Sequence, residues 1–169
     1  KDFTLSSLVT LDELIDASKK NNVVFVMAGG LGERLKPLTE SVPKPMLLLG
    51  GKPIIQIILE NFIDQGFQNF YFSVNYKSDV ITNYFKNGSA WGVDIKYIKE
   101  EKQLGTAGSL SLIKEKINEP IIVINGDIIT KVNFQKIINF HYFHKSDATM
   151  VINSKEVALP YGVVEKKDF

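Results

Sequence analysis

Hydrophobic and polar positions follow two different periods along this chain. Consecutive apolar residues, rich in β-branched and aromatic side chains, predict buried strands at 23–27, 69–74, 94–98, 120–124 and 148–153. Apolar positions at helical spacing predict helices at 53–65, 79–85, 105–117 and 133–145. Because strands and helices alternate along the chain, the pattern indicates right-handed βαβ units and an α/β fold, with a mainly parallel sheet covered on both faces.

The first 22 residues are expected to stand apart from this fold. Thr10, with Glu13 three residues later, predicts a capped helix start, and this helix is expected to fade at 19–22. We interpret 1–22 as a leader or linker helix, with a helix packed on the domain itself as the alternative. Residues 23–169 contain no repeat or low-complexity linker, so they are predicted to form one domain.

Composition and charge exclude several classes of protein. With 44% hydrophobic and 23% charged residues, the chain resembles an ordinary globular domain, and its net charge of +1 without a dense basic run argues against a nucleic-acid binder. The absence of cysteine excludes disulfides and cysteine-based zinc sites, and agrees with a reducing compartment. No apolar run approaches the roughly 18 residues of a membrane span, and no signal peptide is visible. A cytoplasmic protein is therefore expected.

The residues after the first predicted strand carry the clearest chemistry. Gly29, Gly30 and Gly32 stand within four residues, and Arg34 follows them, with Lys44 further along. Glycines bring no Cβ atoms between a phosphate and the backbone N–H groups, while the basic side chains can neutralise it. This loop predicts a polyphosphate cradle, and a solvated glycine-rich turn is the alternative.

Two familiar glycine-loop templates do not fit. A P-loop requires Ser or Thr after its Gly-Lys pair, but Gly51-Lys52 is followed by Pro53. A dinucleotide-binding fingerprint requires Gly or Ala where Leu35 stands, and the predicted second strand does not end in a ribose-binding acid. A redox domain that binds a dinucleotide is therefore disfavoured.

Another template fits over two blocks. Residues 28–39, AGGLGERLKPLT, with Pro-Lys-Pro at 43–45, resemble the signature of the sugar nucleotidyltransferases, also called NDP-sugar pyrophosphorylases. The chain looks most similar to the N-terminal part of the mannose-1-phosphate guanylyltransferase-like branch. The resemblance implies the nucleotide-diphospho-sugar transferase fold, a Rossmann-like three-layer α/β/α structure, here truncated. In some relatives a regulatory module, often a pair of CBS domains, precedes this domain, and 1–22 resembles the joint.

The resemblance implies a transferase that couples a sugar 1-phosphate with a nucleoside triphosphate and releases pyrophosphate. That reaction needs positioning and charge neutralisation more than a nucleophilic side chain. Arg34 and Lys44 are the expected catalytic residues, and Asp127, at the end of the strand before it, is the expected ligand of Mg²⁺. The expected nucleotide-binding loop comprises Ala28, Gly29, Gly30, Gly32 and Glu33.

A further motif is expected to read the base. The sequence LGTAG at 104–108 resembles the base-reading loop of the guanylyltransferase branch, which assigns Gly105 and Thr106 to the nucleotide. The base-contacting side chain of the family falls most nearly on Glu100. A carboxylate only accepts hydrogen bonds, which suits the N1–H and amino group of guanine, so GTP is favoured. Two surface glutamates before a helix are the alternative interpretation.

The last segment resembles the sugar site of relatives. Tyr161 and Gly162 belong to a YGVV sequence that lines this site in the family, although Tyr161 could equally be a core aromatic residue. An E-K-P segment that holds the sugar and a second metal-binding aspartate belong to the continuation in relatives and are missing here. His141 and His144 have no acidic partner in the pattern and are expected to be surface or packing residues.

The leading hypothesis is an NDP-sugar-forming enzyme for polysaccharide biosynthesis that uses Mg²⁺ and favours GTP. A thymidylyl- or cytidylyltransferase is the alternative within the class. A non-catalytic regulatory paralogue that binds nucleotide-sugar is the alternative outside it, and the presence of Arg34, Lys44 and Asp127 argues against it. The expected partners are the two substrates, and neither nucleic acid nor membrane is expected. The sugar and the oligomeric state, including a homo-oligomer, stay open.

Overall fold

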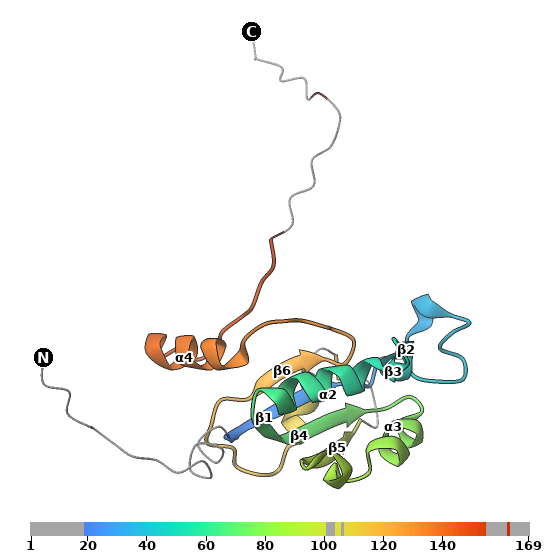
Figure 1. The fold of residues 1–169 in the computed structure, drawn as a ribbon, viewed down its shortest axis with the longest axis horizontal. Helices are drawn as coiled ribbons and strands as arrows, with labels where there is room; N and C mark the ends of the chain where they lie inside the picture. The colour runs from blue at the N-terminus through green and yellow to red at the C-terminus, as the bar shows by residue number, and fades with distance from the viewer. Residues whose placement is uncertain (1–18, 101–103, 106, 155–161, 163–169) are drawn as a thin grey trace, which may run out of the picture. The chain divides into compact units, whose positions relative to one another are not determined.

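A computed structural model describes residues 19–100, 104–105, 107–154 and 162 (Figure 1). The chain divides into two compact units after Gln135, and each is described by itself. The predicted N-terminal helix lies outside the described residues, and so do Thr106 and Tyr161. The division at residue 22 therefore stays a prediction, although the first strand begins at Lys20 and includes the last three residues assigned to the leader.

The first unit is built on a four-stranded parallel sheet. Its strands are β1 (Lys20–Met27), β4 (Phe67–Val74), β5 (Asp94–Lys99) and β6 (Ile122–Asn125). They lie in the order β5-β4-β1-β6, and all three pairs are parallel. The prediction of an α/β fold with a mainly parallel sheet is confirmed.

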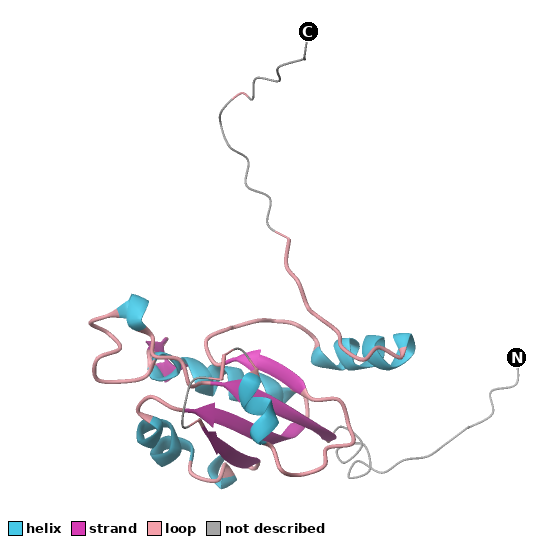
Figure 2. Ribbon diagram, turned by 180° about the vertical axis from the view of Figure 1, so that it is seen from behind, coloured by secondary structure: helices cyan, strands magenta, loops and turns pink. Residues whose placement is uncertain are grey.

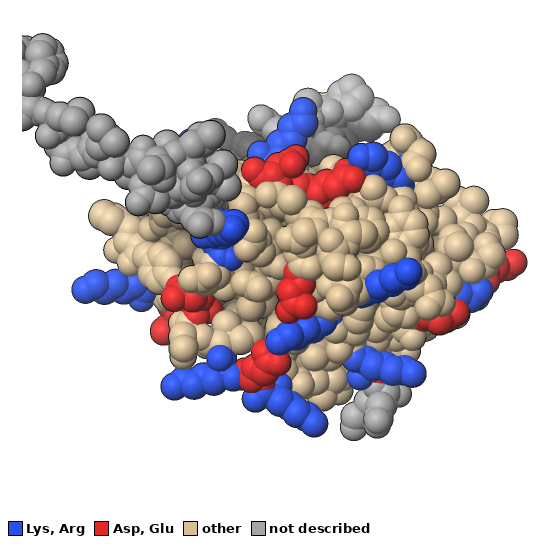
Figure 3. Space-filling view, turned by 60° about the horizontal axis from the view of Figure 1, so that its bottom comes forward, with Lys and Arg blue, Asp and Glu red and all other residues tan. Residues whose placement is uncertain are grey.

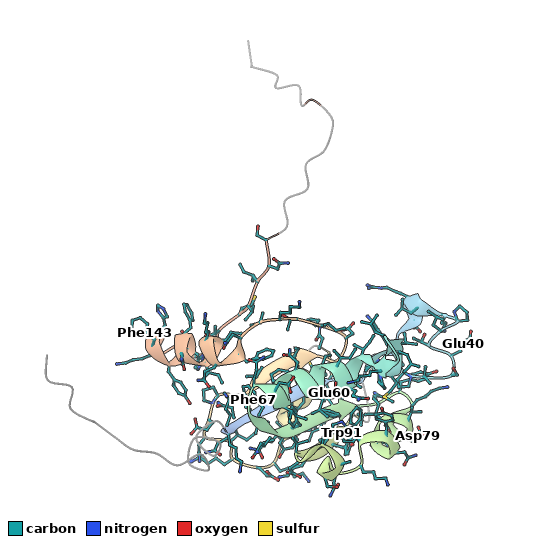
Figure 4. All side chains as sticks on the ribbon, in the orientation of Figure 1. Glu40, Glu60, Phe67, Asp79, Trp91 and Phe143 are labelled. Carbon is teal, nitrogen blue, oxygen red and sulfur yellow. The ribbon has the colours of Figure 1, made fainter. Side chains whose placement is uncertain are left out.

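Two helices cover one face of the sheet. These are α2 (Ile54–Asp64) and α3 (Ser78–Phe85), labelled in Figure 1. Their side chains meet those that alternate strand positions send to this face. The ring of Phe62 on α2 lies 6.3 Å from Phe70, and Phe72 lies 5.4 Å from Phe85 on α3. These rings are fully buried and belong to an aromatic cluster in the core that includes Phe67, labelled in Figure 4.

The inward face of α2 differs from the predicted one in part. The apolar positions whose helical spacing predicted this helix are Ile54, Ile57, Ile58, Phe62 and Ile63. The buried positions are Ile55, Ile58, Leu59 and Phe62, which follow the i, i+3, i+4, i+7 spacing of one helix face. Because nearly every residue of this helix start is apolar, the pattern alone did not select the stripe that meets the sheet.

A short 3₁₀ helix and an irregular segment cover the opposite face. Leu110 of η4 (Gly108–Leu112), with Ile113, Ile117 and Ile121, packs on Val23, Phe25 and Tyr71. Figure 2 shows this helix in front of the sheet when it is seen from behind. The three-layer architecture is thus present, with the second outer layer made largely of irregular chain.

The predicted helix at 105–117 is therefore wrong for most of its length. Gly105 (φ 77°) and Ala107 (φ 59°) adopt the left-handed conformation, which a right-handed helix excludes. Only Gly108–Leu112 is helical, and Ile113 returns to an extended conformation (φ −70°, ψ 117°). The apolar spacing at 110, 113 and 117 serves irregular packing on the sheet instead.

The remaining elements are short. A two-residue Gly50-Gly51 turn with positive φ values joins β2 (Leu48–Leu49) to β3 (Lys52–Pro53), as tight hairpins require. Three 3₁₀ turns, η1 (Glu33–Leu35), η2 (Lys44–Met46) and η3 (Ser89–Trp91), complete the first unit. Lys52 donates to Glu60 of α2 (labelled in Figure 4) at 2.8 Å, so this lysine is paired rather than merely solvated.

The second unit begins within α4 (Phe134–His144), which confirms the helix predicted at 133–145. The strand predicted at 148–153 is absent, and Met150, Val151 and Ile152 are exposed. A strand forms only where its backbone groups pair with a neighbour, and the described residues supply no such partner here. His141 contacts Thr149 at 3.0 Å through Nδ1.

Two surface properties agree with the composition. On the face shown in Figure 3, lysine and arginine side chains are interspersed with aspartate and glutamate, without a patch of one sign. Among the helices that the structure describes, none is long and apolar enough to cross a bilayer.

Candidate active site

The strand order creates a crevice at the carboxyl end of the sheet. The connection from β1 to β4 runs over one face through α2, whereas the connection from β5 to β6 runs over the other through η4. Ligands bind at such reversal points in open parallel sheets. A cleft of about 590 Å³ lies there, and it is lined by 27–35, Lys44, Pro45, Glu100, Gly105, Ser109 and Asn125, Gly126 and Asp127.

The glycine loop after β1 is fixed by a hydroxyl group from its own far end. Gly32 has a φ of 65°, and the buried Thr39 donates its hydroxyl to the Gly32 carbonyl oxygen at 2.9 Å. A Cβ at Gly32 would lie 2.9 Å from Thr39 Cγ2 and 3.2 Å from Lys44 Cβ. Gly32 therefore permits both the left-handed turn and the close approach of the Lys44 segment.

The other two glycines have different surroundings. A Cβ at Gly29 would lie 3.3 Å from Glu100 Oε1, so glycine brings the loop backbone close to that carboxylate. A Cβ at Gly30 would meet no atom within 4 Å. Gly30 is exposed and lines the cleft, so its bare backbone faces open space there.

Arg34 lies on η1 and lines the same cleft. Its side chain is exposed, and among the described residues it makes no ion pair with the nearby carboxylates of Glu33 and Glu40. A guanidinium that is not committed to a neighbouring carboxylate can turn both branches of its planar fork toward phosphate oxygens.

Lys44 and Asp127 meet although 83 positions separate them, and their side chains form an ion pair. Lys44 lies in η2 between Pro43 and Pro45, where the Met46 N–H donates to the Pro43 carbonyl oxygen at 2.8 Å. Asp127 follows Gly126, whose N–H donates to the Met27 carbonyl oxygen at 2.8 Å. A Cβ at residue 126 would lie 3.0 Å from that oxygen, so glycine lets the end of β6 close on β1.

The chemistry of Asp127 fits a magnesium site that is completed by substrate. In the part of the chain that the structure describes, no group of three or more His, Cys, Asp or Glu residues could hold a metal ion. Mg²⁺ commonly takes one or two protein carboxylates and fills its octahedron with water and phosphate oxygens. A single carboxylate in the same cleft as the glycine loop matches that pattern.

Glu100 closes the side of the cleft at β5. Its backbone N–H donates to the Val74 carbonyl oxygen at 3.1 Å, which extends the sheet pairing by one residue. Its Oε1 accepts a hydrogen bond from the Ser73 hydroxyl, and its Oε2 accepts one from the Leu104 N–H at 3.4 Å. The carboxylate is therefore held in place beside Gly29.

The structure brings most of the predicted site residues into one cleft. These are Ala28, Gly29, Gly30, Gly32, Glu33, Arg34, Lys44, Glu100, Gly105 and Asp127. Thr106 and Tyr161 lie outside the described residues, and Gly162 belongs to the second unit. The roles assigned to these three residues stay predictions.

Some lining residues escaped the sequence analysis. Ser109, at the start of η4, is buried and lines the cleft, and its position directly after Gly108 of the LGTAG sequence was the available signal. Asn125, the last residue of β6, also lines the cleft, and its position two residues before Asp127 was the available signal. Ser73 carried no motif, because only its contact with Glu100 distinguishes it.

Comparisons with known proteins agree with this geometry. The model of the nucleotidyl transferase family matches residues 23–168. The mannose-1-phosphate guanyltransferase of Pichia angusta is 37% identical over 144 residues, which cover 83% of this chain and 40% of that protein. The chain therefore spans about two fifths of the length of the curated relatives it matches.

Solved structures show the same fold. HddC from Yersinia pseudotuberculosis, complexed with GMP-PN, superposes with a TM-score of 0.61 at 33% identity and covers 71% of this chain and 54% of its own. A UDP-glucose pyrophosphorylase complexed with UDP-glucose, at 20% identity and a TM-score of 0.59, covers 73% and 54% and supports the fold alone. The parallel sheet with its glycine-loop cleft defines a nucleotidyltransferase domain, and the chain belongs to the nucleotidyl transferase family.

Proposed function

We propose that this chain is the nucleotide-binding part of an enzyme that transfers a nucleotidyl group from GTP to a sugar 1-phosphate. The observation that carries the proposal is the cleft in which Arg34, Lys44 and Asp127 meet around a glycine loop at the carboxyl end of a parallel sheet. The relatives named as mannose-1-phosphate guanylyltransferases support the same reaction class.

In this reaction an oxygen of the sugar phosphate attacks the α-phosphorus of GTP. The new P–O bond forms as the bond to the β-phosphate oxygen breaks, and pyrophosphate leaves with its electron pair. Arg34 holds oxygens of the leaving pyrophosphate as their negative charge grows, and the Lys44 ammonium neutralises the α-phosphate and the incoming phosphate together. The glycine loop offers backbone N–H groups to the triphosphate.

Asp127 would hold the divalent cation, and Mg²⁺ supplies charge neutralisation on the nucleotide oxygens when it is bound. In the free chain Lys44 pairs with this carboxylate, so Asp127 would release Lys44 when it holds the cation. Lys44 is then available to the phosphates, which is the arrangement the transfer needs.

Glu100 would select the base. Its carboxylate offers acceptors to the N1–H and the amino group of guanine, and the fold neighbour complexed with GMP-PN supports a guanine nucleotide. Gly105 and Thr106 would border the base, and Tyr161 and Gly162 would border the sugar. A thymidylyl- or cytidylyltransferase would need a different pattern of donors and acceptors at Glu100. We place the reaction in the cytoplasm, where it would supply an NDP-sugar for polysaccharide synthesis.

The test is a pyrophosphate-release assay of the full-length protein. It uses GTP, dTTP, CTP or UTP with a panel of hexose 1-phosphates that begins with mannose 1-phosphate, with and without Mg²⁺. We expect magnesium-dependent turnover that is fastest with GTP. Turnover that is fastest with dTTP or CTP would assign that nucleotide to the enzyme in place of GTP. No turnover with any pair of nucleotide and sugar phosphate would contradict the proposal.

A matched pair of variants tests the role of the cleft. Arg34→Ala is expected to lower kcat/KM by about 10²–10³, the usual loss when one charge-stabilising donor is removed. Lys36→Ala is the control, because Lys36 is an exposed cation two residues away that does not line the cleft. Equal losses in both variants would mean that general positive charge, rather than the Arg34 fork, supports the reaction.

A further inference from the structure

Ser73 is a buried polar residue in the hydrophobic layer of the sheet. It is the last residue but one of β4, its exposed fraction is 0%, and its register neighbours are Met27 on β1 and Ile98 on β5. Met27 and Ile98 both pack in the apolar cluster on this face. A buried hydroxyl needs a hydrogen-bond partner to offset its lost hydration. The apolar side chains around Ser73 do not themselves need a hydroxyl group among them.

The partner of this hydroxyl lies in the cleft. Ser73 donates to Oε1 of Glu100, whereas the Leu104 N–H donates to Oε2 at 3.4 Å. A carboxylate carries about four lone-pair sites, so one acceptor site remains on each oxygen. The two hydrogen bonds fix the plane of the carboxylate and leave one acceptor site on each oxygen, in a residue that lines the cleft and whose Oε1 lies beside Gly29.

We propose that Ser73 is a positioning residue for base selection, which fixes the Glu100 carboxylate so that both oxygens accept from a purine carrying adjacent N–H and amino donors. This inference rests on the proposed function, because it assigns Glu100 to the base. Two parallel hydrogen bonds require a defined carboxylate plane, whereas a rotating carboxylate keeps its charge but loses the pairing geometry. Ser73 itself touches no substrate and acts only through Glu100.

The test compares GTP with inosine triphosphate, whose base keeps the N1–H and lacks the 2-amino group. In the full-length protein the ratio of kcat/KM values for GTP and inosine triphosphate measures how well the second acceptor is placed. Ser73→Ala is expected to lower this ratio about tenfold, the usual effect of one well-placed hydrogen bond between charged and neutral partners. Ser73→Thr, which keeps the hydroxyl, is expected to retain most of it.

The chain provides a matched control two residues earlier. Tyr71 lies on the same strand and face, is buried, and donates its hydroxyl to Glu115 Oε2 at 2.9 Å, outside the cleft. Tyr71→Phe removes an equivalent hydroxyl-to-glutamate hydrogen bond from the same layer. It is expected to leave the nucleotide ratio unchanged while its melting temperature falls, which separates base selection from a general loss of stability.

The outcomes distinguish the two proposals. A Ser73→Ala protein that keeps the wild-type ratio, or that loses GTP and inosine triphosphate activity equally, would overturn the positioning role and leave the transferase proposal intact. If the wild-type protein shows no preference for GTP over inosine triphosphate, the assignment of Glu100 to the base is overturned. The inference about Ser73 is then overturned as well. A selective fall with GTP in Ser73→Ala, absent in Tyr71→Phe, supports both.

Discussion

Gly32 and Gly30 lie two residues apart in one loop, yet a side chain would have opposite consequences at the two positions. Gly32 is left-handed and faces Thr39 and Lys44 at contact distance, whereas a Cβ at Gly30 would project into open space. The structural need for glycine is therefore concentrated at Gly32. At Gly30 a Cβ would meet no atom of the described residues within 4 Å, so packing within this part of the protein does not require glycine there.

Gly32→Ala is expected to destabilise the protein by about 1–2 kcal/mol or more, because alanine must adopt the left-handed conformation and also displaces Thr39. Gly30→Ala should change the free energy of unfolding by less than about 0.5 kcal/mol, as at other uncrowded surface positions. Urea denaturation of both variants measures the difference. Equal stabilities would show that the loop can relax around a Cβ at residue 32.

A second prediction for single residues concerns the ion pair between Lys44 and Asp127. The ammonium group occupies the carboxylate that Mg²⁺ would use, and both side chains remain partly exposed, so the pair is weak and exchangeable. Lys44→Met is therefore expected to tighten binding of Mn²⁺, a spectroscopic substitute for Mg²⁺, in the absence of nucleotide by about threefold to tenfold.

Electron paramagnetic resonance titration of free Mn²⁺ provides the measurement, with Asp127→Asn as the control that should abolish this binding. The rate of catalysis is expected to fall, because Lys44→Met also removes the cation that we propose for the phosphates. Weaker Mn²⁺ binding in Lys44→Met would mean that the lysine organises the metal site instead of competing for it.

At the scale of elements, a polar cluster fastens the irregular crossover to the sheet. Glu115, in the segment after η4, accepts from Lys96 on β5 at 2.8 Å and from the Tyr71 hydroxyl on β4 at 2.9 Å. Hydrogen bonds from Lys96 and then from Tyr71 lower the pKa of the Glu115 carboxyl below its ordinary value of 4.5. The same pairing raises the pKa of Lys96 above 10.5.

The sign of the pH effect follows from these two directions. A carboxyl group with a lowered pKa in the folded state stabilises the protein above pH 4.5, and this stabilisation is lost as the pH falls through the lower, folded-state value. Glu115→Gln should therefore have a lower melting temperature than the wild type at pH 7, and the gap should narrow below pH 4.5. Thermal denaturation between pH 3 and pH 8 measures it.

Glu40→Gln is the matched control, because the Glu40 side chain, labelled in Figure 4, makes no ion pair among the described residues. It removes the same charge without removing a hydrogen-bonded partner. If the difference in melting temperature between the wild type and Glu115→Gln stays constant with pH, the ionisation of Glu115 is not what fastens the crossover. The shape of its side chain would then be responsible.

At the scale of the whole first unit, the core is organised around one aromatic side chain. The ring of Phe62 stacks on Phe134 at 4.0 Å and meets the edges of Phe67 and Phe70 at 5.3 and 6.3 Å. These contacts join α2 to the sheet and to the segment that follows β6. Aromatic pairs of this kind add to the free energy of burying their surface.

Phe62→Ala is expected to cost about 3–5 kcal/mol, the usual range for emptying a buried phenylalanine site, which is a large share of the stability of an ordinary domain. Phe143→Ala is the control, since Phe143 is 82% exposed (Figure 4) and should change stability by less than about 0.5 kcal/mol. Chemical denaturation compares them. A loss below about 1 kcal/mol for Phe62→Ala would mean that neighbouring rings refill the site.

The sequence by itself determined the class of fold and predicted most of the residues that line the cleft. Local spacing predicts β1, β4, β5, β6, α2, α3 and α4, because a buried strand or an amphipathic helix must carry its period in its own residues. The glycine loop, Arg34, Lys44 and Asp127 were visible for the same reason. Glycine and charge are local requirements of phosphate binding, and parallel strands bring their carboxyl ends to one edge.

Only the tertiary structure decided which distant groups meet. The contacts of Lys44 with Asp127, and of Ser73 with Glu100, depend on strand order and register, which no local period encodes. The same limit explains the two wrong elements. The apolar spacing at 105–117 packs largely without a helix, because Gly105 and Ala107 are left-handed, and the run at 148–153 meets no partner strand among the described residues. The local preference of a segment favours a helix or a strand, but its contacts with other segments determine whether that element forms.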